Sequence, residues 1–312
     1  MNKIVSIVIQ VIVALIVFII LNNLAVYIMK QEDVIDDPTK LVATKLFTGW
    51  VETASFTDKA FNIHNPFALN YRKMPHSVNR MGGAQFSYTM WIKLNDVSAS
   101  NTADHILFLQ GDQQQYNYHT SQVKSSGFSS DNIEKDHLDY LVKCPLVKFG
   151  DSADNLIVEF NTTRDISARA EINRIKSADE TIRHNVFSLM PGNWSLMTFI
   201  FEDDRRYNEH EDGVIFTFYL NNVLYHTQRY KGALRLNKGD LHILPTGTSQ
   251  SPMTGGYLDD LTYYNYALNL NDINKLVTAG ITNSRYNEME GDPSFNTPLY
   301  LNMYNKLEIS NA

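Results

Sequence analysis

The alternation of side-chain character within short segments restricts the fold of this chain more than any other feature of the sequence. In FSYTMWIKLND, apolar side chains occupy every second position, namely Phe86, Tyr88, Met90, Ile92 and Leu94. The positions between them hold Ser87, Thr89, Trp91 and Lys93. Because successive side chains of a strand point to opposite faces, this period of two predicts a β-strand with one face in a core.

Several further segments have the composition of short strands. ILFLQ at 106–110 and LIVEF at 156–160 are apolar runs bounded by turn residues, and Asn221-Asn222 predicts a tight turn into VLYHT at 223–227. WSLMTFIF at 194–201 and VIFTFYL at 214–220 are apolar on both faces, as expected of central strands between two layers. The pattern predicts an all-β fold, an antiparallel β-sandwich of the jelly-roll kind.

The segment GGYLDDLTYYNYALNLNDI combines a strand pattern with a helix start. Residues 261–266 are mostly aromatic or of strand type, after two glycines that favour a turn. Asn269 is a good N-cap, Leu268 and Ile273 are spaced as a hydrophobic staple, and Gly280 is a typical stop. We therefore expect one short C-terminal helix.

The N-terminal segment Ile4–Met29 carries no charge. As a helix that rises about 1.5 Å per residue it would span a hydrocarbon layer of ~30 Å, which predicts a single transmembrane α-helix. A cleaved signal peptide and a buried core helix are the alternatives. The run is too long for the apolar part of a signal peptide, and no small-residue cleavage site follows it. Lysines flank both ends of the run, so the charges leave the side of the membrane open.

Charge and cysteine content exclude a nucleic-acid partner, an intrachain disulfide and a cysteine-based metal site. The chain has 27 basic and 34 acidic residues, a net charge of −7, and no basic stripe to follow a phosphate backbone, so we expect no nucleic-acid partner. Cys144 is the only cysteine, so neither an intrachain disulfide nor a cysteine-based metal site can form.

The predicted organisation has four parts. They are an anchor (1–30), a linker and entry strand (31–60), the sandwich (61–280) and a C-terminal arm (281–312). The arm adds either an edge strand or a partner-binding segment, and the sequence leaves both open.

Five segments in this order resemble the concanavalin A-like lectin/glucanase superfamily, and within it the laminin G-like and pentraxin-like jelly rolls. They are FSYTMWIKL, ILFLQGD, GNWSLMTFIF, GVIFTFYLNNVLYHT and GGYLDDLTYYNYALNLNDI. NRMGGAQFSYTMWIKL behind an N-terminal anchor also resembles anchored laminin G-like minor capsid or virion proteins of large DNA viruses of algae and protists. That resemblance implies a place between an internal membrane and the protein coat.

Catalytic patterns are missing from the sequence. Retaining glucanases of this superfamily need two carboxylates about 5 Å apart, which an E-x-D-x-x-E strand supplies. Glu202-Asp203-Asp204 and Glu290-Gly291-Asp292 do not complete that pattern, and the nine histidines show no metal-binding spacing. We therefore expect no enzyme activity.

Calcium is the one cofactor that the superfamily resemblance implies, with Asp112, Asp259 and Asp260 as its candidate ligands. The alternative is that the adjacent aspartates satisfy backbone donors at a strand edge while Asp112 ends a strand. The absence of a D-x-D-x-D loop favours the alternative. Asn161-Thr162-Thr163 and Asn193-Trp194-Ser195 match the N-glycosylation pattern, and chance explains both.

Tyr263, Tyr264 and Tyr266 are candidates for a ligand or partner face, because tyrosines stack on sugar rings and pack at protein interfaces. Two functions follow. The first is a non-enzymatic, single-pass membrane protein whose sandwich binds a coat or scaffold protein, placed at a virion internal membrane if the chain is viral. The second is a membrane-displayed lectin that binds a glycan.

Overall fold

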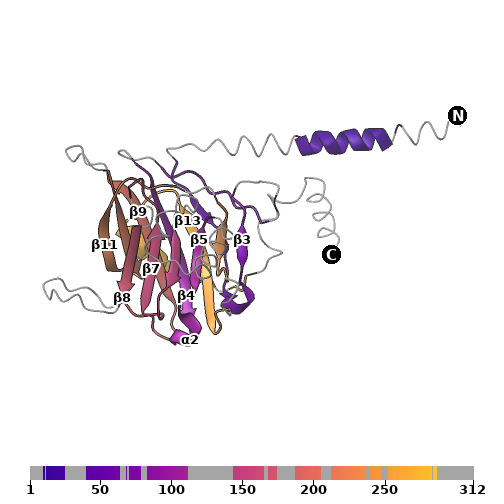
Figure 1. Ribbon diagram of the computed structural model, residues 1–312. Helices are drawn as coiled ribbons and strands as arrows, with labels where there is room; N and C mark the ends of the chain where they lie inside the picture. The colour runs from indigo at the N-terminus through magenta and orange to yellow at the C-terminus, as the bar shows by residue number, and fades with distance from the viewer. Residues whose placement is uncertain are drawn as a thin grey trace, which may run out of the picture.

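The computed structural model describes residues 10, 12–24, 40–63, 68, 70–78, 83–111, 143–164, 168–173, 187–204, 212–236, 239–246, 252–282 and 284–286. Within these residues two antiparallel sheets pack against each other, and Figure 1 shows their strands side by side. The prediction of an all-β sandwich with one short C-terminal helix is therefore confirmed. Asp112 and most of the C-terminal arm lie outside the described residues.

The larger sheet has seven strands in the order β1-β13-β4-β9-β10-β11, with β2 also paired to β13. Its strands are β1 (Ala43–Lys45), β2 (Val51–Glu52), β4 (Gln85–Leu94), β9 (Ser195–Asp204), β10 (Gly213–Leu220), β11 (Val223–Lys231) and β13 (Gly256–Tyr264). The expected hairpin at Asn221-Asn222 joins β10 to β11. β9 is central, which explains why its sequence is apolar on both faces.

The smaller sheet has six strands in the order β3-β12-β5-β6-β7-β8. Its strands are β3 (Lys59–Phe61), β5 (Ile106–Gln110), β6 (Leu146–Phe149), β7 (Asn155–Phe160), β8 (Ala168–Asn173) and β12 (Leu241–Ile243). The expected linker and entry strand (31–60) overlaps three strands, of which β1 and β2 join the larger sheet and β3 joins the smaller one. The same part of the chain also includes the 3-10 helix η1 (Thr53–Ser55).

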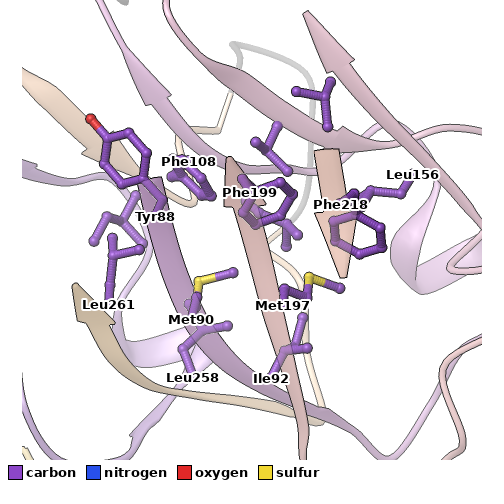
Figure 2. Packing of buried hydrophobic residues seen from close by; sticks show 14 of the residues in the cluster. Tyr88, Met90, Ile92, Phe108, Leu156, Met197, Phe199, Phe218, Leu258 and Leu261 are labelled. Carbon is purple, nitrogen blue, oxygen red and sulfur yellow. The ribbon is translucent and has the colours of Figure 1, made fainter. Parts of the chain in front are cut away.

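The core lies between the two sheets. The period of two in β4 places Tyr88, Met90 and Ile92 inward, and Figure 2 shows them beside Met197 and Phe199 of β9. Aromatic rings connect the layers, with Tyr88 5.3 Å from Phe108 between ring centroids. Such pairs add to the free energy gained by burying apolar surface. The Tyr88 hydroxyl donates to Gln110 Oε1 at 2.9 Å, so the buried phenol is not left without a partner.

β13 begins earlier than the sequence pattern indicates. The structure starts it at Gly256 rather than Leu261, because Tyr257 and Leu258 already pair with β4. The strand absorbs its two aspartates by a register shift between Asp259 and Thr262, with Asp260 in a left-handed conformation at φ 46°. The prediction of a strand confined to residues 261–266 was therefore wrong at its start.

Helix α5 (Leu270–Ala279) covers part of the outer face of the larger sheet. Asn269 Oδ1 accepts the N–H of Asp272 at 3.0 Å, as expected of an N-cap, and Gly280 follows the helix at φ 71°. Leu268 and Ile273, the predicted staple, pack in one cluster with Ile200 of β9. A second short helix, α2 (Ala99–Thr102), lies between β4 and β5.

The N-terminal segment is partly described. Residues 10 and 12–24 are helical, and their large apolar side chains are exposed all round, from 44% for Ile19 to 63% for Phe18. Figure 1 draws this helix in indigo, apart from the strands. Among the described residues, no helix combines the length and the apolarity needed to cross a bilayer.

The N-cap provides a test of how α5 is held. Asn269→Ala removes the acceptor for the Asp272 N–H and should lower the free energy of unfolding by about 1 kcal/mol, measured by chemical denaturation. Asn271→Ala is the matched control, because Asn271 is exposed inside the helix, where alanine is the better helix former. Equal losses from the two substitutions would contradict the capping role.

Candidate functional site

Asp259 is buried at the bulge of β13. Its side chain is fully inaccessible, and Oδ2 accepts the backbone N–H of Thr282, just after α5, at 2.7 Å. Oδ1 makes no hydrogen bond of good geometry among the described groups, although the N–H groups of Gly49 and Asp260 favour the charged carboxylate. Burial nevertheless raises the pKa of Asp259 to about 6, and the neighbouring carboxylate of Asp260 acts in the same direction.

Asp260 lies beside it with more access to solvent. Its Oδ2 accepts from the Thr282 hydroxyl at 2.9 Å and lies 3.5 Å from Lys45 Nζ. Asp259 and Asp260 thus hold the same residue, Thr282, one through its backbone and the other through its side chain. The pair fastens the chain after α5 onto the sheet.

These contacts bear on the two interpretations of the aspartates. Asp259 accepts a backbone N–H, as the second interpretation expects, and the calcium assignment stays a prediction. Within the described part of the chain, no three His, Cys, Asp or Glu side chains gather as metal ligands would. Asp112, the third calcium candidate, lies outside the described residues.

The three candidate tyrosines do not form an open face. Tyr263 is 6% exposed and packs in the core against Tyr88, with ring centroids 5.2 Å apart. Tyr264 is 7% exposed, in the same cluster as Ile273 of α5. Tyr266 is partly exposed and packs edge-on against Tyr264 at 5.7 Å. Prediction of a binding face from Tyr263 and Tyr264 was therefore wrong, because the sandwich and α5 bury both rings.

A different group of aromatic side chains remains partly exposed on the larger sheet. We call it the aromatic ledge and define it as Trp50, Trp194 and Tyr257. Tyr257 lies in the middle, with ring centroids 5.9 Å from Trp50 and 6.4 Å from Trp194. Lys93 Nζ is 5.6 Å from the centre of the Tyr257 ring, and Arg285 Cζ is 5.6 Å from that of Trp50. These are cation–π distances.

Strand register explains how the ledge is assembled. Tyr257 of β13 lies opposite Glu52 of β2 on one side and Lys93 of β4 on the other, so the three side chains share the outer face. Continuing the β4–β9 register by one residue places Trp194 opposite Lys93. The ledge is therefore one row across neighbouring strands, with Trp50 beside it.

The backbone holds the ledge from both ends. Trp50 N–H donates to Ser284 O at 3.0 Å and Trp50 O accepts from Tyr286 N–H at 3.0 Å, which also brings Arg285 over the ring. Gly49 allows this approach, since a Cβ there would lie 2.9 Å from Tyr286 N. At the other end, Gly192 N–H donates to Leu94 O at 2.7 Å just before Trp194.

Sequence reasoning missed the ledge. The period of two in β4 indicates that Trp91 and Lys93 share the outer face, and that is the only local signal. Trp50 and Trp194 come from connections far apart along the chain, and only the pairing of β2, β13, β4 and β9 brings them together.

The two glycosylation patterns differ in access. Asn161 is fully buried and its Oδ1 accepts the Lys143 N–H at 2.7 Å, so it cannot carry a glycan in the folded protein. Asn193 is exposed.

Comparison with known proteins gives no family. No protein-family model matches the chain, and no curated protein matches it either. Among solved structures, it is similar to the receptor-binding domain of botulinum neurotoxin mosaic serotype C/D, with a TM-score of 0.39, 11% identity, and coverage of 64% of this chain and 37% of that one. It is also similar to the binding domain of Paraclostridial Mosquitocidal Protein 1, with a TM-score of 0.40, 12% identity, and coverage of 77% and 47%.

A third similar structure is the botulinum neurotoxin serotype D binding domain, with a TM-score of 0.40, 11% identity, and coverage of 78% of this chain and 51% of that one. The chain spans about half or less of the length of these three proteins. Their names state that they are binding domains. At these scores the likeness carries no argument about what the present chain binds.

Asp259 predicts a pH dependence of stability. Because its pKa is about 6 in the fold and 3.8 ordinarily, the folded protein binds more protons than the unfolded chain between these values. The contribution of this group to the free energy of unfolding should therefore rise by about 1 kcal/mol as pH falls from 7 to 5. Denaturant unfolding at several pH values measures it.

Asp259→Asn should remove this rise, since an amide keeps an acceptor for Thr282 N–H but does not titrate. Asp104→Asn is the control, because the side chain of Asp104 is 69% exposed. If Asp259→Asn unfolds with the pH profile of the parent, the assignment to Asp259 is wrong.

Proposed function

We propose that the chain is a membrane-attached binding protein without catalytic activity. The observation that carries this proposal is the exposed apolar surface of the N-terminal helix, on which every large side chain from Ile12 to Leu24 is uncovered. A helix that is apolar on all sides needs either a bilayer or a protein interior around it. The uncharged run Ile4–Met29 has the length for a bilayer.

We propose that the chain has no catalytic activity because its acidic side chains are not arranged as a catalytic pair. Asp259 and Asp260 are neighbours in the sequence, and both are engaged by Thr282. Asp259 is also inaccessible to a substrate. Glu202 is followed by Asp203 and Asp204 without the spacing that places two carboxylates across a glycosidic bond.

The partner we propose first is a coat or scaffold protein, with the sandwich joining a virion membrane to that coat. The sequence resemblance to anchored laminin G-like jelly rolls supports this reading. The alternative is a lectin, and the aromatic ledge favours it, because tryptophan and tyrosine present an apolar ring with a polar tip. The two readings share the anchor and differ in the partner.

The anchor is tested by membrane association. Ile16→Arg combined with Ile20→Arg should abolish the carbonate-resistant association of the full-length chain with liposomes, because each arginine costs about 2.5 to 3.5 kcal/mol at the centre of a membrane helix. Flotation on a density gradient measures it. Val223→Arg combined with Leu236→Arg is the matched control on exposed apolar side chains of the sandwich. Loss of flotation in both, or in neither, would contradict the anchor.

The partner is tested by cross-linking on the native membrane or particle, followed by mass spectrometry. Lys45, Lys231 and Lys275 are exposed and suit this purpose, whereas Lys143 is buried in an ion pair with Glu159 at 2.6 Å. Repeated cross-links from these lysines to one coat protein are expected. A sandwich that cross-links to no protein would contradict the coat-binding reading.

A further inference from the structure

The rings of the aromatic ledge differ from the rings packed between the two sheets in their access to solvent. Rings such as Tyr88, Phe199 and Phe216 are fully buried between the sheets. Trp50, Trp194 and Tyr257 keep part of their surface open, although each packs against its neighbour. The sandwich thus has an ordered aromatic surface that its own core does not use.

Backbone pairing holds Tyr257 and Trp50 of the ledge in place. Tyr257 is on a nine-residue strand paired on both sides. Trp50 is fixed by two backbone hydrogen bonds to residues 284 and 286. The backbone of Tyr257 and Trp50 is therefore held by strand pairing and hydrogen bonds, and little conformational entropy would be lost when a ligand binds.

Charges around the rings give the ledge its chemical preference. Lys93 and Arg285 lie over the ring faces of Tyr257 and Trp50. Glu52 is the acidic group of the same row, opposite Tyr257. Among the described residues, the cations Lys93 and Arg285 and the carboxylate of Glu52 therefore lie at the ledge, although the whole chain has a net charge of −7. A ligand with an apolar face and an anionic group fits this pattern.

We propose that the aromatic ledge binds a sugar ring that carries a carboxylate or a sulfate group. The apolar face of the ring packs on Tyr257 and its tryptophan neighbours, and Lys93 and Arg285 bind the anionic group. Sugar hydroxyls have partners in the indole N–H groups, the phenol and Glu52. This inference rests on the lectin alternative of the proposed function and names its ligand class.

A protein partner matches the ledge less well. A standard protein interface buries about 800 Å² on each side, whereas the ledge consists of three rings that are each partly covered. Its scale is that of one or two sugar units.

The test uses the full-length chain in a mild detergent with three matched probes: lactose, sialyllactose and sulfated lactose. All three tryptophans of the chain, Trp50, Trp91 and Trp194, are in the larger sheet or directly beside its strands, so intrinsic fluorescence reports on this region. Titration calorimetry gives the dissociation constants. We expect one or both acidic probes to bind roughly tenfold tighter than lactose, and the comparison of the two identifies the anionic group.

Variants locate the site. Tyr257→Ala and, separately, Trp194→Ala should weaken binding of the acidic probe roughly tenfold, and Tyr257→Phe should retain it. In the Lys93→Met, Arg285→Met double variant, the dissociation constants of the acidic probes and of lactose should become equal, because the groups that bind the anion are gone. Tyr219→Ala is the control, a partly exposed tyrosine in the helix-covered cluster of the same sheet. Thermal unfolding confirms that each variant is folded.

Each contrary result overturns a defined part of the proposal. If no probe binds the folded chain, the proposed ligand class is wrong. The proposed binding to a coat protein is tested separately, by the cross-linking experiment. Binding that survives both ring substitutions places the site elsewhere. Equal affinity for lactose and the acidic probes refutes the role of the two cations.

Discussion

Contact between aromatic rings across the two sheets is the interaction on which the rest of the structure depends. Tyr88 meets Phe108, Phe108 meets Phe199, and Phe160 meets Phe201, each pair joining a strand of the larger sheet to one of the smaller. With only one cysteine in the chain, no intrachain disulfide supplements this packing. The free energy that holds the sandwich together therefore comes mainly from apolar burial.

Once the sheets are packed, the outer face of the larger sheet becomes the second place where structure is decided. α5 covers one part of it through Leu268 and Ile273. The chain after α5 covers another part, fastened by Asp259 and Asp260. The aromatic ledge lies beside this covered region and stays partly open. Ser284 and Tyr286 hold the backbone of Trp50 by two hydrogen bonds, and Arg285 between them lies over the Trp50 ring.

In the function that we propose, attachment and recognition belong to different parts of the chain. The apolar helix occupies the start of the described chain, and the ledge lies on the sandwich, assembled from residues 50 to 285. Under this proposal the helix attaches the protein to a membrane, and the ledge on the larger sheet binds a partner near it. Both proposed partners, a coat protein and an acidic glycan, are compatible with that role.

The sequence by itself determined the fold class, because the period of two and the doubly apolar segments are local consequences of strand geometry. It also determined the Asn269 cap, which depends on residues three apart. Tertiary structure decided the rest. The strand pattern leaves the exposure of Tyr263 and Tyr264 open, and only the packing of the core and α5 buries both rings. The contact of Asp259 with Thr282 likewise depends on how the chain after α5 lies on β13. Trp50 and Trp194 become neighbours of Tyr257 only through the pairing of four strands. These residues are far apart in the sequence, so no local pattern could predict the contact.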